Sequence, residues 1–352
     1  MIDLDTMDFA AFDPGDMLGR ISELGTQLLV SWDMHADLDL PPQASRATSI
    51  VIAGMGGSAT AGDYFAALCA DSSEVPVTVV RGYRLPNYVS DRTLVVVCSY
   101  SGNTEESVSA YDDAWKRGAT IIVITTGGQL AERAKLDSAM LIEFDYRAQP
   151  RAAIAHGLGP LLRIGAVLGL TAVDRAEAEA TAHLHQNFVY QLARPQAPAA
   201  QNPTKQLAMA LHGRIPLVIG AEHLASVASR FKNQVAENGK ALGAADTLPE
   251  ANHNLVVGLA TGAVAAKTLS LVTLESSGYD TRTQKRFEVT TQMFEEQGIP
   301  VHRILVPGAR PLEQIILATA WGDFASYYLA ALNGQDPSPV PPIDRLKAAL
   351  AE

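Results

Sequence analysis

The sequence predicts an α/β protein in which parallel β-sheets are covered by helices and divided between two domains. Short apolar runs rich in Val and Ile alternate with helix-like segments, a pattern typical of strands buried on both faces of a parallel sheet. At 352 residues the chain exceeds the size at which one hydrophobic core usually stops growing. The polar, proline-rich stretch 194–203 separates two such series, so we expect one domain over 1–195 and another over 204–352.

The first series opens with amphipathic helices over 8–35 and contains five strand candidates. Each candidate is a short apolar run, and they lie at 49–53, 75–80, 94–98, 120–125 and 140–144. Helices are expected between most of them, including 59–70 and about 104–116. Two further helical stretches follow, at 152–170 and 175–192.

The second series repeats the alternation after the linker. Its strand candidates are 215–220, 254–259, 267–274 and 301–305, and its helix candidates are 224–241, 285–297 and 312–333. An extended tail at 336–342 precedes a short terminal helix at 343–351. The two halves suggest an internal duplication, although no repeat is strong at the level of single residues.

Composition excludes several classes of function. The 27 Lys and Arg against 38 Asp and Glu give a formal net charge of −11, which argues against nucleic-acid partners and anionic membranes. Two cysteines in apolar settings imply neither a disulfide framework nor a zinc cluster, and we read no metal site. The N-terminus lacks the features of a signal peptide and no apolar run is long enough to span a bilayer, so the expected location is the cytoplasm.

The run from Val95 to Glu106 is the most informative stretch. An apolar strand candidate ends in Ser-Tyr-Ser-Gly-Asn, and a helix candidate begins at about Thr104. The first turn of a helix has unpaired backbone N–H groups and a partial positive charge, so it attracts anions. Ser99, Ser101 and Thr104 add hydroxyl groups there, which favours a site for a phosphate monoester. The alternative is an ordinary N-cap; a Walker loop is excluded because no Gly-Lys-Ser/Thr follows.

A glycine-rich turn follows the first strand candidate. Gly54, Gly56 and Gly57 let the backbone come close to a ligand and open a helix tightly, and Ser58 comes next. The turn is only loosely similar to a dinucleotide-binding fingerprint. The third glycine is missing, and basic Arg81 stands at the end of the next strand candidate where an acidic residue is expected. NAD binding is therefore disfavoured.

Arg151 and Glu237 have neighbourhoods compatible with catalysis. Arg151 follows a proline at an expected sheet edge, where a guanidinium binds phosphate or a developing oxyanion; a surface arginine before a helix is the alternative. Glu237 comes late in an apolar-striped helix, with Gln234 and Asn238 at one-turn spacing on the same polar face. It is a candidate general base, and a solvated glutamate is the alternative.

His253 lies in the turn-rich segment 249–254, which we expect just before a strand. Imidazole titrates near neutrality and transfers protons in either direction, and Asn252 and Asn254 flank it where they can orient the ring. A turn or cap histidine is an equally good interpretation. Lys347, in the terminal helix candidate, indicates by itself only a solvated helix.

Six segments of the chain occur in the order of one known family. They are Gly54-Met-Gly-Gly-Ser58, Ser99-Tyr-Ser-Gly-Asn-Thr-Glu-Glu106, Gln149-Pro-Arg151, Gln234-Val-Ala-Glu-Asn238, Pro249-Glu-Ala-Asn-His-Asn254 and the tail from Ile343 to Lys347. Together they resemble the bifunctional phosphoglucose/phosphomannose isomerases, which are built from two sugar-isomerase (SIS) domains. The serine–threonine loop alone marks an SIS domain, whereas the glutamate and histidine segments in this order are specific to the family.

The resemblance implies two SIS-type domains, each a five-stranded parallel sheet flanked by helices. It implies a homodimer with a composite active site. The implied activity is metal-independent and cofactor-free: an aldose–ketose isomerase that interconverts glucose 6-phosphate or mannose 6-phosphate with fructose 6-phosphate through a cis-enediolate.

The resemblance also assigns roles to single residues. Substrate-binding roles fall on the glycine-rich and hydroxyl-rich turns, at Gly56, Gly57, Ser58, Ser99, Ser101 and Thr104. Glu237 is the implied base that moves a proton between C1 and C2, and Arg151 is the implied stabiliser of the enediolate. His253, which reaches the site from the partner subunit, and Lys347 are the implied ring-opening groups.

Two other functions stay open on the sequence. The chain can be a non-catalytic phosphosugar-binding SIS protein, although its first fifty residues are acidic and contain no basic recognition helix. It can also be an isomerase for another sugar phosphate, such as an aminosugar phosphate. All three interpretations share the phosphate loop, so Glu237 and His253 decide between sensing and catalysis.

Overall fold

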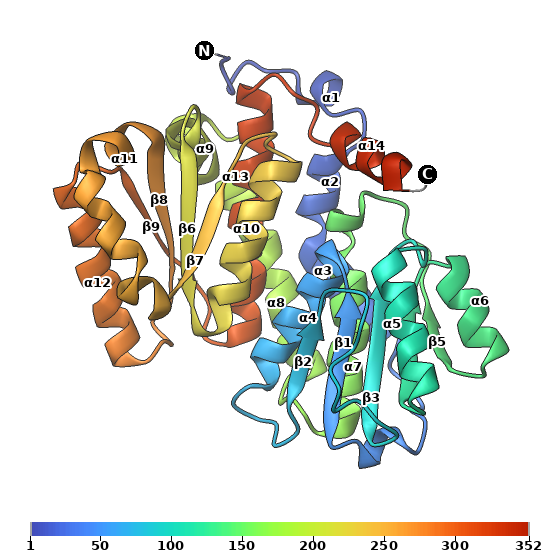
Figure 1. Ribbon diagram of the computed structural model, residues 1–352. Coiled ribbons are helices and arrows are strands. Elements are labelled where there is room, and N and C mark those ends of the chain that lie inside the picture. Colours follow the sequence, from blue (N-terminus) through green and yellow to red (C-terminus); the bar gives the residue numbers. More distant parts are fainter. Residues whose placement is uncertain (1, 351–352) are drawn as a thin grey trace. The chain divides into compact units, whose positions relative to one another are not determined.

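The computed structural model describes residues 2–350, apart from the side chains of 260 and 261, and divides them into two compact units (Figure 1). Unit 1 comprises residues up to Ser22, His185–Arg310 and the chain from Gln314 onward. Unit 2 comprises Glu23–Leu184 with Pro311–Glu313. The expected terminal helix 343–351 extends one residue beyond the described part, since residue 351 lies outside it.

Unit 2 contains a five-stranded parallel sheet in the order β2-β1-β3-β4-β5, counted within the described residues. This confirms the predicted α/β class and all five strand candidates of the first series. The strands are β1 (Ser49–Gly54), β2 (Val77–Val80), β3 (Thr93–Ser99), β4 (Thr120–Thr125) and β5 (Met140–Glu143).

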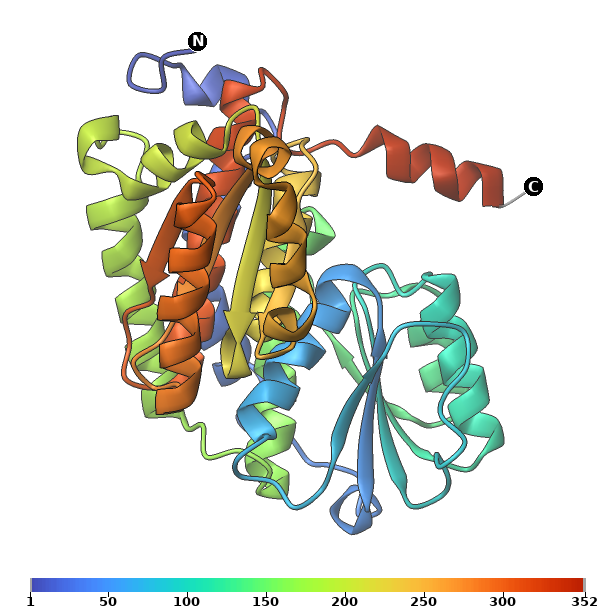
Figure 2. The ribbon, with the colours of Figure 1, turned by 60° about the vertical axis from the view of Figure 1, so that its left-hand side comes forward.

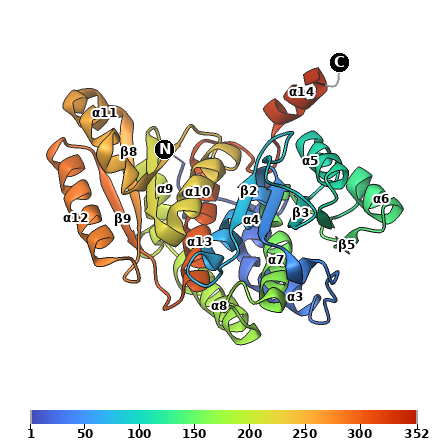
Figure 3. The same ribbon diagram turned by 60° about the horizontal axis from the view of Figure 1, so that its bottom comes forward.

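Helices cover both faces of this sheet, and Figure 3 shows the two layers. Because side chains alternate along a strand, Val51, Val95 and Val123 share one face with the core against α5 and α6. Ile52 lies on the opposite face, where Gly62 allows α4 to approach it closely. The helices are α3 (Leu24–Asp33), α4 (Gly56–Cys69), α5 (Glu105–Lys116), α6 (Gly128–Leu136), α7 (Ile154–Leu168) and α8 (Arg175–Phe188), which ends in unit 1.

Unit 1 contains a second parallel sheet, in the order β7-β6-β8-β9 (Figure 2). The resemblance implied five strands, but the described residues of unit 1 form four. They are β6 (Ile215–Ala221), β7 (Ala244–Leu248), β8 (Leu269–Glu275) and β9 (Val301–Leu305). Its helices are α1 (Phe9–Phe12), α2 (Met17–Ser22), α9 (Pro203–Leu211), α10 (Ala225–Glu237), α11 (Gly262–Thr268), α12 (Thr281–Glu296), α13 (Pro311–Leu332) and α14 (Pro341–Leu350).

The predicted strand at 254–259 is wrong. Leu255–Thr261 forms a 3₁₀-helix instead, and the strand of this region is β7, which precedes it. A short apolar run reads equally well as a strand or a buried helical segment. The sequence of β7, Ala-Ala-Asp-Thr-Leu, lacks a β-branched apolar run, and as an edge strand it is only partly buried.

Helix α13 is long and apolar enough, by length and composition alone, to cross a membrane. In the protein, 94% of its most apolar window is buried, which is typical of a core helix. Tyr327 and Tyr328 are fully buried on it and make ring contacts with Phe9 of α1 at 6.0 and 5.7 Å. The N-terminal helices therefore pack on the core of unit 1, although the sequence placed residues 1–22 with the first domain.

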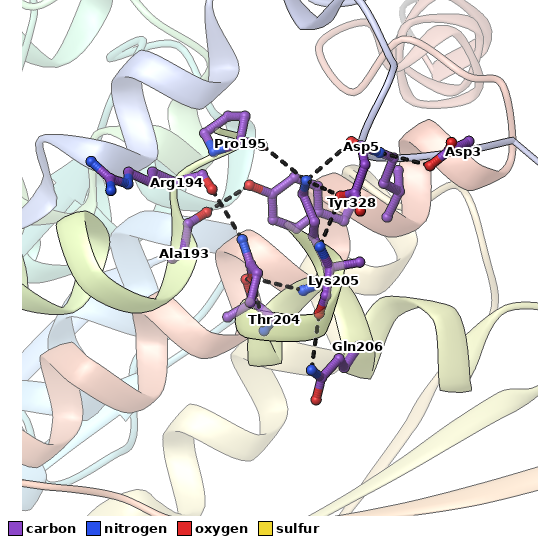
Figure 4. A network of polar contacts seen from close by, with 12 residues as sticks. Asp3, Asp5, Ala193, Arg194, Pro195, Thr204, Lys205, Gln206 and Tyr328 are labelled. Carbon is purple, nitrogen blue, oxygen red and sulfur yellow. Dashed lines mark hydrogen bonds and ion pairs between the residues drawn. The ribbon is translucent and has the colours of Figure 1, made fainter. Parts of the chain in front are cut away.

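A buried lysine fixes the start of the chain in unit 1 (Figure 4). Lys205 of α9 is 0% exposed, and its ammonium donates to the carbonyl oxygens of Leu4 at 3.0 Å and Pro195 at 2.9 Å. It also pairs with the Asp5 carboxylate at 2.9 Å, which holds the pKa of Asp5 below its ordinary value. A buried charge is costly unless it is paired and hydrogen-bonded, and here every contact ties the N-terminal segment or the linker to α9.

An aromatic stack in unit 2 encloses a histidine that carries no charge at neutral pH. The His156 ring stacks on Phe144 at 5.4 Å and contacts the tilted ring of Tyr146 at 4.4 Å between centroids. Its Nε2 has no hydrogen-bond partner among the described residues. Burial, aided by the nearby His35, lowers the pKa of His156 from 6.5 to about 4.

We expect the unfolding free energy to fall as the pH drops from about 6.5 toward 4. In that window the unfolded chain binds a proton at residue 156 and the folded chain does not, so acid favours unfolding, by about 3 kcal/mol for this shift. His156→Phe keeps the stack and removes the titration. Urea unfolding at pH 7.5 and pH 4.5 should show a smaller pH-dependent loss for this variant; an equal loss in both proteins would contradict the account.

Candidate functional site

The predicted ligand loops of unit 2 meet where the strand order reverses. From β1 the chain crosses through α4 to β2 on one side, whereas β3 lies on the other side of β1. In open parallel sheets this topological switch point, at the carboxyl ends of the strands, is the usual place for a ligand. Gly54 and Cys98 are register partners, so the turns that follow them start side by side.

The loop after β3 is shaped by its own hydroxyl groups. Ser99 is 3% exposed; its Oγ donates to Thr104 Oγ1 at 3.0 Å and accepts from the Gly102 N–H at 3.2 Å. Ser101 is exposed, and its Oγ accepts from the Asn103 N–H at 3.2 Å. Ser99 therefore holds the loop, whereas Ser101 presents its hydroxyl to the surroundings.

Helix α5 begins directly after this loop. Thr104 is its N-cap residue, and among the described contacts its side chain caps none of the N–H groups of the first turn. Those N–H groups and the partial charge of the helix start form an anion-attracting position beside the loop hydroxyls. This geometry agrees with the phosphate interpretation, and the binding role of these residues stays a prediction.

Gly102 lets this loop pack against the loop after β4. Its φ is 66°, and a Cβ there would lie 1.8 Å from the carbonyl oxygen of Gly127. The Gly102 carbonyl accepts from the Leu130 N–H at 3.0 Å, and Asn103 Oδ1 accepts from the Gln129 N–H at 3.1 Å. No other residue type fits at position 102 without moving one of the two loops.

The glycine-rich turn and Arg151 lie together at the start of α4. Gly56 has φ 51°, and no described atom lies within 4 Å of where its Cβ would be. A Cβ on Gly57 would lie 3.2 Å from the carbonyl oxygen of Pro150 and 3.5 Å from the Arg151 Cα. Arg151 is 3% exposed, so it is not the surface arginine of the alternative interpretation.

A small cavity of about 20 Å³ opens between these elements of unit 2. Gly57 and Ser58 line it from α4, and Tyr100 and Phe144 line it from the loops after β3 and β5. The two rings are in edge contact at 6.2 Å, and Tyr100 Oη donates to the Tyr146 carbonyl oxygen at 2.6 Å. Sequence reasoning missed this aromatic wall, for which the Ser-Tyr-Ser motif and Phe144 at a strand end were the available signals.

Glu237 is the last residue of α10 in unit 1 and is half-buried. The helix is held by a row of buried polar contacts with α13: Arg230 and Gln234 bind the Asp323 carboxylate at 3.0 and 2.7 Å, and Asn238 Nδ2 donates to Ser326 Oγ at 3.2 Å. Gln234 and Asn238 thus share a polar face, which is buried against α13.

His253 is exposed at the end of a 3₁₀-helix, Glu250–His253, that follows the carboxyl end of β7. The segment thus follows a strand rather than preceding one, which still places it at the functional edge of a parallel sheet. Asn252 Nδ2 donates to Thr290 Oγ1 at 2.8 Å and Asn254 Nδ2 to Glu250 Oε1 at 2.8 Å, so both amide groups bind side chains other than that of His253. Lys347 is exposed on α14, whose ten residues are all exposed.

At the switch point of unit 1, between β6 and β8, side chains of the unit bond to one another. The Glu222 carboxylate accepts from the Asp280 N–H at 3.1 Å, at the start of α12. Gln314 Oε1 accepts from Ser276 Oγ at 2.7 Å and lies 2.6 Å from His223 Nε2. These residues were not predicted, since their contacts join distant parts of the chain. Within residues 2–350, no group of three or more His, Cys, Asp and Glu side chains is placed to hold a metal ion.

We expect Gly102→Ala to lower the unfolding free energy by roughly 3 kcal/mol or more, because the new methyl group meets a backbone carbonyl that must move. The matched control is Gly213→Ala, at φ 76° with no described atom within 4 Å of the added carbon; it should cost only about 1–2 kcal/mol. Urea unfolding measures both changes. Equal losses would show that the loop contact at Gly102 is not tight.

Comparison with known families adds an independent finding. The SIS domain model matches residues 44–149, and the model described as bacterial phospho-glucose isomerase C-terminal SIS domain matches residues 200–350. The chain is also similar in fold to the solved glucose-6-phosphate isomerase-like protein of Thermus thermophilus, with a TM-score of 0.63, 20% identity and coverage of 97% of this chain and 99% of that one.

Curated relatives match over nearly the whole length. The chain is 34% identical to the bifunctional phosphoglucose/phosphomannose isomerase of Caldicellulosiruptor bescii, over 96% of this chain and 99% of the relative. It is 33% identical to the protein of the same name in Aquifex aeolicus, over 86% of this chain and 90% of that relative. The chain therefore belongs to the bifunctional phosphoglucose/phosphomannose isomerase family.

Proposed function

We propose that this protein interconverts glucose 6-phosphate and mannose 6-phosphate with fructose 6-phosphate. The observation that carries the proposal is its 34% identity to a curated isomerase over 99% of that protein's length. The candidate base and acid–base residues, Glu237 and His253, are both present in the segments that resemble the family. A non-catalytic phosphosugar-binding protein has no use for either group.

Unit 2 supplies the proposed phosphate-binding groups. The uncapped start of α5 offers backbone N–H groups and a partial positive charge, and the exposed Ser101 hydroxyl lies beside it. Ser99 and Thr104 bond to each other and keep the loop in this shape. Gly56 leaves open space at the start of α4, and the sugar end of the substrate is proposed to bind on this side of Gly57 and Ser58.

The proposed chemistry moves one proton between two neighbouring carbons. Glu237 takes the proton from C2 of the open-chain aldose and returns it to C1, while the hydroxyl proton passes between O1 and O2 through the cis-enediolate. Arg151, with backbone N–H groups near Gly56 and Gly57, stabilises the negative charge that develops on oxygen. His253 and Lys347 transfer the protons for ring opening. C1 is reduced from an aldehyde to an alcohol while C2 is oxidised from an alcohol to a ketone, so the reaction consumes no cofactor.

Two further points belong to this proposal. The protein acts as a cytoplasmic homodimer, and His253 is contributed to the site by the partner subunit. Sedimentation equilibrium measures the oligomeric state, and a monomer with full activity would contradict the composite site.

Glu237→Gln should abolish turnover, with a loss of at least about 100-fold, and leave sugar-phosphate binding largely intact, because the amide keeps the shape of the side chain but accepts no proton. A coupled fructose 6-phosphate assay measures turnover, and thermal shift measures binding. Glu132→Gln, an exposed glutamate of α6, is the control and should be fully active. Turnover retained in Glu237→Gln would remove this residue from the role of base.

Ser101→Ala should raise KM for the sugar phosphate and change kcat little, because it removes one hydroxyl from the proposed phosphate position. Ser277→Ala is the matched control, since Ser277 stands two residues after β8 as Ser101 stands two residues after β3. Steady-state kinetics with glucose 6-phosphate separate the two constants. An unchanged KM in Ser101→Ala would count against the phosphate-binding role of the loop.

A further inference from the structure

Lys240 joins the end of α10 to the proline-rich tail of the chain. Its ammonium donates to three backbone carbonyl oxygens, those of Glu237 at 2.6 Å, Pro337 at 3.1 Å and Pro339 at 2.6 Å. Glu237 is the proposed base, and the tail leads directly into α14, which carries Lys347. One side chain therefore connects the backbone of two segments to which the proposed function gives catalytic roles.

The end of α10 is attached to its surroundings by several polar contacts. The middle of α10 is fixed to α13 by the buried pair of Arg230 and Asp323, two turns before the helix ends. At the end itself, Asn333 Nδ2 donates to the Gly239 carbonyl oxygen at 2.7 Å, which holds the turn after the helix to the end of α13. Lys240 links this turn to the carbonyl groups of Pro337 and Pro339.

The backbone at Lys240 is in a conformation that a lysine adopts only with strain. Its φ is 52°, in the left-handed region that glycine adopts at the lowest cost and that ordinary residues adopt with strain. A lysine near the end of a helix is also favourable there, because its charge faces the unpaired carbonyl groups and the negative end of the helix dipole. Lys240 therefore has a strained backbone, and its ammonium binds the carbonyl groups at the end of the helix.

We propose that Lys240 is a positioning residue for the isomerase reaction, an inference that rests on the proposed function. A base that serves both C1 and C2 needs a mobile carboxylate on a fixed backbone, and Lys240 fixes the backbone carbonyl of the base itself. It also holds the backbone at Pro337 and Pro339, just before the helix that carries Lys347.

The experiment compares three substitutions in the full-length protein. Lys240→Met keeps the aliphatic stem and removes the donors, Lys240→Gly also relieves the backbone strain, and Lys240→Arg keeps a cation with several donors. Ser138→Gly is the matched control, because it relieves a similar left-handed backbone, φ 55°, at an exposed position of unit 2. The readouts are kcat, KM, melting temperature and the isotope effect with sugar phosphate deuterated at C2.

We expect Lys240→Met and Lys240→Gly to lower kcat by about 10- to 100-fold with KM within about threefold, because misplacing a reacting group costs rate rather than affinity. The isotope effect should rise as proton abstraction becomes slower. Lys240→Gly should melt above Lys240→Met and yet be as slow, whereas Lys240→Arg should recover part of the rate and Ser138→Gly should keep all of it.

A structural role alone would change the melting temperature and leave kcat and the isotope effect at the wild-type values. That result in Lys240→Met and Lys240→Gly would overturn the inference while the isomerase function stands. If the wild-type protein binds the sugar phosphates and converts none, the proposed function fails, and the role of Lys240 fails with it.

Discussion

The structure of unit 2 depends on one constraint, the close approach of two loops at the carboxyl edge of a parallel sheet. Parallel strands place all their following turns at one edge, and the reversal of strand order between β1 and β3 sends α4 and α5 to opposite faces of the sheet from neighbouring turns. Gly102 lets the loop after β3 pack on the carbonyl of Gly127, and with that packing the hydroxyls of Ser99 and Thr104 meet. The anion-attracting start of α5 follows from this arrangement rather than from any charged side chain.

The two units show that a shared topology does not give a shared chemistry. Both sheets reverse their strand order at the equivalent place, but in unit 1 the Glu222 carboxylate and Gln314 bond to other groups of the unit there. The candidate proton-transfer residues of unit 1 lie at the ends of two elements, Glu237 at the end of α10 and His253 after β7. Function therefore depends on which side chains are placed on the fold, and fold similarity to solved phosphosugar proteins cannot decide it.

Much of the fold was predictable because the signals are local. Five apolar runs of unit 2 became its five strands, and a helix begins where Thr104 ends the hydroxyl-rich turn. What failed depends on contacts between distant residues. The attachment of Leu4 to Lys205, the aromatic wall at Phe144 and the three carbonyls around Lys240 have no signature in a single segment. The edge strand β7 was missed because its composition is polar and small, and its pairing with β6 comes from the sheet.

The central claim is that one protein holds a six-carbon sugar phosphate by its phosphate and moves a proton between C1 and C2. The most direct measurement follows wild-type protein with ¹³C-labelled glucose 6-phosphate and, separately, mannose 6-phosphate in D₂O by NMR. The account predicts that fructose 6-phosphate forms from both aldoses. Solvent deuterium should appear at C1 in the fraction of turnovers in which the proton held by Glu237 exchanges with D₂O before it is returned. Binding of both sugar phosphates with no product and no deuterium incorporation would contradict it.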